Sequence, residues 1–240
     1  MPINILKTLI LRCNDKNEVL AGLFIKENFN FNNYPLLDES LKGFQIHLSN
    51  PLSPASVSDE KLFEQGQDFL EIITRGKKLK FGLLSFFQIN FVLFKIVLED
   101  ISEFLDSSKS AIDYYSGVGA ISLPLSSEFK DCILVDNDKE AIYYADENIR
   151  ENQINNCKTI YKSAEKTTEL IDKNKIIIFD PPRAGLHKKI IRKILLEKPI
   201  RIIYLSCNPS TQARDIQLLQ SSYEIKFLRL YNFFPRTPHI

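Results

Sequence analysis

From residue 111 onward, short apolar runs alternate with longer segments whose apolar residues follow helical spacing. Residues 176–179 (Ile-Ile-Ile-Phe) form a continuous apolar run, which is typical of a strand buried on both faces. Strand–helix alternation at this spacing predicts a parallel sheet with helices on both faces. Ligands in such α/β folds bind beyond the carboxyl ends of the strands.

The sequence predicts two regions. Residues 1–85 lack the alternation and hold apolar segments between Asn-rich turns, which predicts a small, mainly β region. Residues 86–240 are predicted to form the α/β domain. Within it we expect strands at 111–115, 132–136, 159–161, 176–180, 200–205 and 223–230, and helices at 91–105, 121–129, 139–152, 190–196 and 211–220.

The overall composition is that of an ordinary globular protein, with 44% hydrophobic and 25% charged residues. No apolar run approaches the length of a membrane span, and the N-terminal stretch lacks the pattern of a signal peptide. The four cysteines are widely spaced and form no Cys-x-x-Cys pair. This argues against a metal or iron–sulfur site and favours a reducing, cytoplasmic location.

Charge is unevenly distributed along the chain. Residues 183–240 hold 11 Lys and Arg against 3 Asp and Glu, a net charge of +8. The net charge of the whole chain is +1, so residues 1–182 have a net charge of −7. A basic C-terminal part could attract a phosphate backbone. The same charges could equally form a solvated helix face around residues 188–193.

A glycine-containing turn is expected where the first strand of the sheet ends. Residues 113–119 read Asp-Tyr-Tyr-Ser-Gly-Val-Gly, and Gly117 and Gly119 would let backbone approach a ligand closely. Alone this is weak evidence, because such a turn needs no ligand and the third glycine of the dinucleotide fingerprint is missing. Asp136 ends the second strand, where an acid can bind ribose hydroxyls or cap a helix.

These features together predict a cofactor that contains a nucleoside. The loop has no Lys, which argues against a triphosphate. S-adenosylmethionine fits better because it carries no phosphate. The strand at 176–180 also ends in a carboxylate, and the sequence Asp180-Pro181-Pro182-Arg183 predicts a stiff loop that either holds a reacting acid or simply turns the chain.

Cys207 follows another apolar run and precedes a strong helix-start signal. Asn208 is a good N-cap residue and Pro209 suits the first helical position. A thiol beside the positive end of a helix is favoured in its thiolate form, which is the nucleophile. The competing interpretation is a small buried hydrophobe.

In these motifs the sequence resembles the S-adenosylmethionine-dependent RNA 5-methyluridine methyltransferases. The resemblance covers roughly residues 80–240 and includes residues 86–90 (Phe-Phe-Gln-Ile-Asn), 113–119, 135–136, 180–183, 206–215 and 234–239. It implies a class I, Rossmann-like methyltransferase sheet, with an N-terminal β region that helps to hold RNA. It also implies that Cys207 is the nucleophile. The cofactor site would be lined by Gln88, Tyr115, Gly117, Gly119, Asp136 and Asp180, and the substrate would meet Phe87, Arg183 and Arg214.

The sequence departs from the family pattern at several points. Asp136 stands where Glu is common, and Ala120 stands where many members have Asn. The N-terminal cysteine cluster and oligonucleotide-binding domain of some members have no counterpart here. The Glu that serves as general base and the closing strand would follow His239, and the chain ends at Ile240. We therefore expect a fragment or truncated form that lacks the last strand of the sheet.

The resemblance implies methyl transfer to C5 of a uridine in tRNA or rRNA, through an adduct between Cys207 and C6 of the base. In this form the chain is expected to bind cofactor and RNA, with turnover impaired. Phe87 could stack on a flipped-out base or simply pack in the core. Alternatives are a 5-methylcytidine or exocyclic-amine methyltransferase, and a catalytically impaired RNA-binding or ribosome-assembly factor. A nicotinamide-dependent enzyme is disfavoured by the missing glycine.

Overall fold

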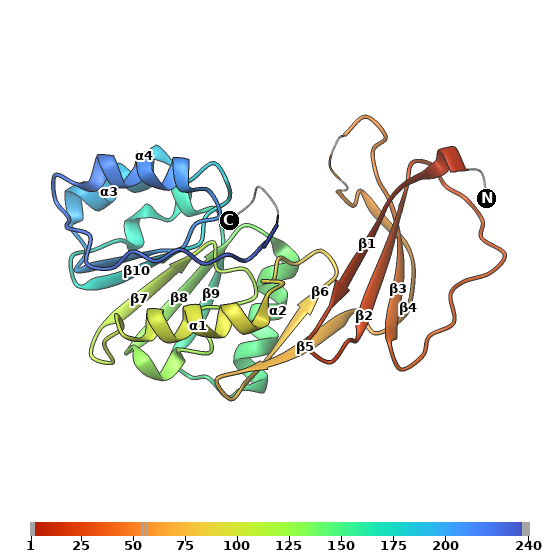
Figure 1. The fold of residues 1–240 in the computed structure, drawn as a ribbon, viewed down its shortest axis with the longest axis horizontal. Coiled ribbons are helices and arrows are strands. Elements are labelled where there is room, and N and C mark those ends of the chain that lie inside the picture. Colours follow the sequence, from red (N-terminus) through yellow and green to blue (C-terminus); the bar gives the residue numbers. More distant parts are fainter. Residues whose placement is uncertain (1–2, 54, 56, 237–240) are drawn as a thin grey trace. The chain divides into compact units, whose positions relative to one another are not determined.

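The structure, a computed structural model, describes residues 3–53, 55 and 57–236. The chain divides into two compact units (Figure 1). The first comprises Met1–Ile72 and Lys80–Ser85, and the second comprises Ile73–Leu79 and Phe86–Ile240. Of the elements described, no helix is long and apolar enough to cross a membrane.

The first unit is built on a four-stranded sheet in the order β1-β2-β3-β4, which confirms the expected N-terminal β region. The outer pairs are antiparallel, whereas β2 and β3 are parallel. Its core includes Ile25, Phe44 and Ile46. The elements up to residue 82 are η1 (Ile3–Ile5), β1 (Leu6–Cys13), β2 (Val19–Ile25), β3 (Leu41–Leu48), β4 (Glu60–Gly66), and the paired strands β5 (Phe69–Thr74) and β6 (Lys77–Gly82).

The second unit contains the predicted parallel sheet. Five strands follow the order β11-β10-β7-β8-β9, and every described pair is parallel. The strands are β7 (Ser110–Tyr114), β8 (Asp131–Asp136), β9 (Cys157–Tyr161), β10 (Lys175–Phe179) and β11 (Arg201–Tyr204). The helices are α1 (Phe91–Ser102), α2 (Lys139–Glu151), α3 (Lys188–Glu197) and α4 (Pro209–Leu219), with short 3-10 turns at η2 (Ser126–Glu128), η3 (Ala164–Lys166) and η4 (Thr168–Leu170).

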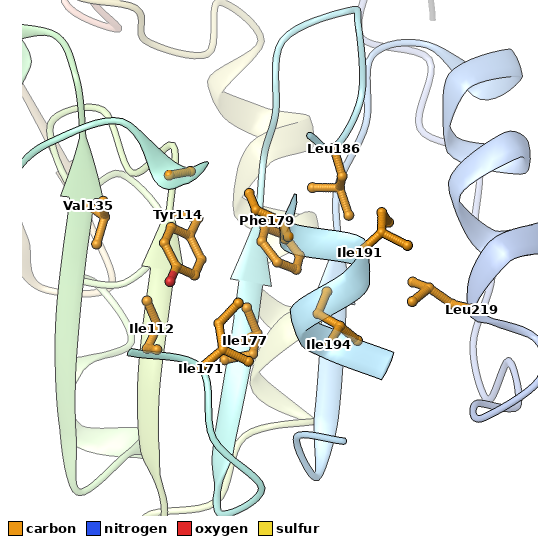
Figure 2. Packing of buried hydrophobic residues seen from close by; sticks show 12 residues of the cluster. Ile112, Tyr114, Val135, Ile171, Ile177, Phe179, Leu186, Ile191, Ile194 and Leu219 are labelled. Carbon is orange, nitrogen blue, oxygen red and sulfur yellow. The ribbon is translucent and has the colours of Figure 1, made fainter. Parts of the chain in front are cut away.

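Helices flank both faces of this sheet, as the alternation predicts. In Figure 1, α3 and α4 lie on one side of the sheet, and α1 and α2 lie on the other. Figure 2 shows apolar side chains of the sheet, including Ile177 and Phe179, packed against Ile191 and Ile194 of α3. Burial of each such side chain contributes about 1.5–3 kcal/mol, so this packing fixes the layers that carry the strand ends.

Two expected elements differ in the structure. The helix expected at 121–129 is replaced by turns and the 3-10 helix η2. The prediction was wrong because Pro124 lies in the middle of the segment, where it lacks the N–H that a helix needs and clashes with the preceding turn. The buried side chains of Ile121, Leu123 and Leu125 hold the segment in the core instead.

The strand expected at 223–230 is also absent, and this segment has no regular structure. Its side chains contact the end of α1 and the residues that follow it. Arg229 donates to Asp100 at 2.7 Å, and the ring of Phe227 lies 5.3 Å from that of Phe104. Side-chain contacts therefore hold the segment without a backbone ladder. The predicted motif at 234–239 continues beyond residue 236, and its last part lies outside the described residues.

The loop after β7 depends on Gly119, which has φ +83°. A Cβ atom there would lie 2.5 Å from Leu123 Cδ1 and 2.9 Å from Leu134 Cδ2. We predict that Gly119→Ala lowers the free energy of unfolding by about 2–4 kcal/mol, because backbone strain and overpacking combine. Denaturant unfolding measures this loss.

Gly76→Ala is the matched control, because Gly76 has φ +75° and nothing lies within 4 Å of its Cβ position. It should lose only about 1 kcal/mol, the cost of the backbone conformation alone. Equal losses for the two variants would refute the packing argument at Gly119.

Candidate active site at the carboxyl edge of the parallel sheet

The strand register brings three carboxylates to one face of the sheet. Asp113 on β7 is paired with Leu134 on β8 and with Ile178 on β10. Asp136 and Asp180 follow those partners by two residues, and side chains two residues apart point to the same face of a sheet. Asp113, Asp136 and Asp180, the acidic trio, therefore converge at the carboxyl edge.

The carboxylate of Asp136 holds the glycine loop. It accepts hydrogen bonds from the backbone N–H groups of Gly117 and Asp138, each at 2.8 Å. Burial raises the pKa of Asp136, and these two hydrogen bonds lower it in part. Asp138 accepts from Ala141 N and caps α2, so Asp136 is not needed as the cap.

The two predicted glycines do different things. Gly117 has φ +55°, and a Cβ atom there would meet only the carbonyl oxygen of Phe86, at 3.7 Å. Space is therefore open beside its backbone. Gly119 is surrounded by Leu123 and Leu134, so its missing side chain serves the packing of the loop.

Gln88 and Asp180 are joined across 92 positions of sequence. Gln88 Nε2 donates to Asp180 Oδ2 at 3.2 Å. Burial raises the pKa of Asp180, and the hydrogen bond from Gln88 opposes that rise. The helix that follows Gln88 is fixed at its start, because the side chain of Asn90 accepts from Leu93 N. The structure thus joins two of the residues expected to line the cofactor site.

Asp113 is the deepest acid of the trio and is 0% exposed. Among the described residues, neither of its carboxylate oxygens meets a donor at hydrogen-bonding geometry. Burial, with smaller contributions from Asp180 and Asp136, raises the pKa of Asp113 to about 7, and nearby Ser122 limits the rise. Asp113 opens the motif at 113–119, but the sequence assigned it no role in the site.

Tyr115 turns the chain from β7 into the glycine loop with φ +61°, an uncommon conformation for a residue with a side chain. It packs against the hydrophobic cluster beneath α3. Burial raises the pKa of its hydroxyl to about 12, and the backbone of His187 lowers it in part. Its side chain thus reaches the start of α3 from the strand end.

Cys207 is an exposed free cysteine three residues beyond β11. The bend that carries it is fixed on its C-terminal side. Asn208 N donates to Ser206 Oγ at 3.1 Å, and the Asn208 side chain accepts from Ser210 N at 3.1 Å. Asn208 is the N-cap of α4 and Pro209 its first residue, as predicted.

The bend at Cys207 is tied to the loop after Asp180. Asn208 Nδ2 and Thr211 Oγ1 each donate to the carbonyl oxygen of Arg183 at 3.1 Å. Because β10 and β11 are neighbours in the sheet, the two loops lie side by side at the same edge. Arg183, expected to meet substrate, is exposed on this loop.

Asp215, which is 1% exposed, holds the loop after Asp180 by hydrogen bonds. Its carboxylate accepts from Leu186 N at 2.8 Å and from the Tyr204 hydroxyl at 2.9 Å. Arg214 Nη2 donates to Asp215 at 2.7 Å and to the carbonyl oxygen of Ala184 at 2.9 Å. The guanidinium of Arg214 therefore already has partners within the protein, whereas it was expected to meet substrate.

The two aromatic residues before Gln88 differ in exposure. Phe87, the expected partner for a base, is 3% exposed and packs with Phe91 and Phe94. The structure thus favours core packing for Phe87. Phe86 is 61% exposed, and its carbonyl oxygen lies beside Gly117. Across the described ranges, no group of His, Cys, Asp or Glu could hold a metal ion.

The fold is that of a class I methyltransferase, and comparison with known proteins identifies the family. The pattern of the tRNA (uracil-5-)-methyltransferase family matches residues 56–240. The chain belongs to that family, which confirms the resemblance seen in its motifs.

Individual relatives agree with this assignment. An uncharacterized RNA methyltransferase of Clostridium tetani is 32% identical over 98% of this chain and 54% of its own length. One from Mycoplasma mobile is 37% identical over 69% of this chain and 46% of its own length. The chain therefore spans about half the length of these curated relatives.

A solved structure is also similar. It is the tRNA (uracil-54, C5)-methyltransferase of Pyrococcus abyssi, in complex with S-adenosyl-L-homocysteine. Its TM-score is 0.82 and its sequence identity 27%, over 98% of this chain and 58% of that one.

Asp215 gives a prediction about the rigidity of the site. Asp215→Ala should lower the free energy of unfolding by about 3 kcal/mol or more, because buried donors lose their shared acceptor. The amide of Leu186 should exchange its hydrogen faster as the loop loosens. Denaturant unfolding and hydrogen exchange provide the two measurements.

Tyr204→Phe removes a single hydrogen bond to Asp215 and serves as the control, with an expected loss of about 1 kcal/mol. If Asp215→Ala were no more harmful than Tyr204→Phe, the acid would not be the anchor of the loop.

Proposed function

We propose that this protein transfers the methyl group of S-adenosylmethionine to C5 of a uridine in tRNA or rRNA, and that residues 86–240 carry the chemistry. The observation that carries the proposal is the meeting of three features at one sheet edge. The exposed thiol of Cys207 lies on a loop bonded to the loop after Asp180, and Asp136 on the same edge holds the glycine loop.

The residues at this edge fit such a methyl donor. The open space at Gly117 lets a ligand approach backbone, and Asp136 supplies a carboxylate suited to ribose hydroxyls. Gln88 and Asp180 form a polar pair that suits an amino acid group. We propose that these four residues hold the donor, with Tyr115 and Gly119 shaping the loop. The complex of the P. abyssi relative with S-adenosyl-L-homocysteine supports this assignment.

S-adenosylmethionine supplies an electrophilic methyl group when bound. C5 of uracil is a poor nucleophile, and Cys207 overcomes this by adding its thiolate to C6, which pushes electron density through the ring to C5. C5 then takes the methyl group, and a general base must remove the C5 proton before the sulfur–C6 bond breaks and the thiolate leaves. The atoms balance, because the uracil ring gains the methyl group and gives its C5 proton to the general base, while the donor leaves as S-adenosyl-L-homocysteine.

Phe86 is our candidate for stacking on the target base. It is exposed beside the glycine loop, whereas Phe87 is needed in the core. Flipped bases stack on aromatic side chains in enzymes that modify them. Arg183, exposed on the loop next to Cys207, is the proposed contact for an RNA phosphate.

The role of Cys207 is tested by substitution. Cys207→Ala should abolish methyl transfer to RNA while S-adenosylmethionine binds with unchanged affinity, because the thiol acts on the base and does not hold the donor. Tritium transfer from labelled donor and calorimetric binding measure the two effects. Digestion of the RNA to nucleosides distinguishes 5-methyluridine from 5-methylcytidine.

Cys13→Ala is the control, because Cys13 is another exposed free cysteine and lies on β1. It should transfer methyl groups at the same rate as the unaltered chain. Methylation that persists in Cys207→Ala at the wild-type rate would eliminate the covalent route.

The two phenylalanines give a second test. Phe86→Ala should weaken RNA binding by about 5- to 150-fold, equivalent to about 1–3 kcal/mol for a lost base stack, with the thermal unfolding midpoint nearly unchanged. Phe87→Ala should lower the free energy of unfolding by about 3–5 kcal/mol, because it leaves a cavity against α1. Gel-shift titration and denaturant unfolding separate the two. If Phe87→Ala weakened RNA binding and Phe86→Ala lowered the free energy of unfolding, Phe87 would be the residue that stacks on the base.

A further inference from the structure

The buried carboxyl of Asp113 is not used by the proposed reaction. It lies beneath the glycine loop at the end of β7, fully enclosed, and neither oxygen has a hydrogen-bond partner among the described residues. The hydroxyls of Ser116 and Ser122, in the loop above, are also buried and unpartnered. Buried polar atoms without partners are uncommon in folded proteins, so this group needs an explanation.

We propose that Asp113 is a positioning residue that holds a proton when no ligand is bound and releases it to solvent when a positively charged ligand binds beside Asp136 and Asp180. This inference rests on the proposed function, because the cationic ligand is the sulfonium of the methyl donor. Asp113 acts by changing the total negative charge of the acidic trio, and it does not touch the reacting atoms.

The geometry selects Asp113 as the proton carrier. Three ionised carboxylates on one face of a sheet would repel one another strongly in a medium of low polarity. Asp136 accepts two backbone N–H groups and Asp180 accepts from Gln88, and these hydrogen bonds favour the ionised form, against burial that raises the pKa of both acids. Asp113 is the most buried of the three, and no donor meets its oxygens at hydrogen-bonding geometry among the described residues, with Ser122 only close enough to lower its pKa in part. Neutralising Asp113 therefore relieves the most charge repulsion. Burial raises the pKa of Asp113 and that of Asp180 alike to about 7, so the choice of Asp113 rests on its complete burial and on the absence of a donor at hydrogen-bonding geometry among the described residues.

The titratable and polar groups near Asp113 lie on the neighbouring strands and on the loop that follows β7. Asp136 and Cys132 lie on β8, Asp180 follows β10, Cys157 lies on β9, and Ser122 lies in the loop. The buried face of α1 is apolar, and the buried polar group of α2, Asn148, donates to Val118 O. None of the groups that act on Asp113 is a cation. An arriving positive charge would therefore be the first to favour its ionised form.

This arrangement discriminates between methyl donor and product. S-adenosylmethionine carries a sulfonium charge that S-adenosylhomocysteine lacks. On this proposal Asp113 is neutral at low pH, where the trio attracts the sulfonium less, and ionised at high pH, where the trio attracts it more. The affinity of the donor relative to the product should therefore rise with pH. Linkage limits the effect of one proton to tenfold per pH unit.

The experiment measures the affinities of both ligands for the full chain by calorimetry at pH 6 and pH 8. In the wild type, the donor-to-product affinity ratio should rise roughly tenfold between these values. In Asp113→Asn it should rise much less. Titration of the ligands' own amino groups is common to both proteins, so it cancels in the comparison.

Asp131→Asn is the matched control. It removes a carboxylate from the opposite end of β8, where Asp131 accepts from Ser110, and it should keep the wild-type pH dependence. If Asp113→Asn fails to fold, carboxyl carbon NMR of wild-type protein tests the same point. The Asp113 signal should titrate near pH 7 without ligand and at lower pH with donor bound.

Each outcome is decisive. A ratio that changes equally in wild type and Asp113→Asn, or an Asp113 signal unmoved by the donor, overturns the inference and leaves the proposed function intact. Failure of both ligands to bind at either pH overturns the proposed function itself.

Discussion

The parallel register of the five-stranded sheet is the constraint on which the candidate site depends. Pairing of β7 with β8 and β10 sets Asp113 level with Leu134 and Ile178, so the acids two residues later on each neighbour reach the same face. Pairing of β10 with β11 brings the loop after Asp180 beside Cys207. A shift of one residue in any strand would send its acid to the opposite face. Burial of the apolar strand residues against α3 makes such a shift costly, so the core and the site are specified together.

Much of this arrangement could be predicted from sequence because its signals are local. The alternation of apolar runs and helical segments indicated the sheet, and the acids that end the runs at 132–136 and 176–180 indicated the edge that holds the site. The cap at Asn208 and the helix-start Pro209 indicated the position of Cys207. The sequence placed Asp136 and Gly117 near each other, at the ends of neighbouring strands. The hydrogen bond from Gly117 N to the Asp136 carboxylate is seen only in the structure.

The rest depends on contacts between distant residues, which the sequence pattern does not encode. Asp215 anchors a loop nearly 30 positions away, and nothing in its immediate neighbours marks that role. Phe86 and Phe87 are adjacent and identical in type, and only the packing of α1 decides which is buried. Pro124 was a local signal against the helix expected at 121–129, but the prediction gave more weight to the apolar periodicity of the segment.

The central claim is that Cys207 at this edge adds to the base that receives the methyl group. Its most direct test uses RNA in which the target uridine is replaced by 5-fluorouridine, together with S-adenosylmethionine. Fluorine at C5 cannot leave as the proton does, so elimination stops and the sulfur–C6 bond persists. The account predicts a covalent protein–RNA species that carries one transferred methyl group, and the linked peptide should contain Cys207. Methylation of the unmodified RNA with no trapped species from its fluorinated form, or a link at another residue, would contradict it.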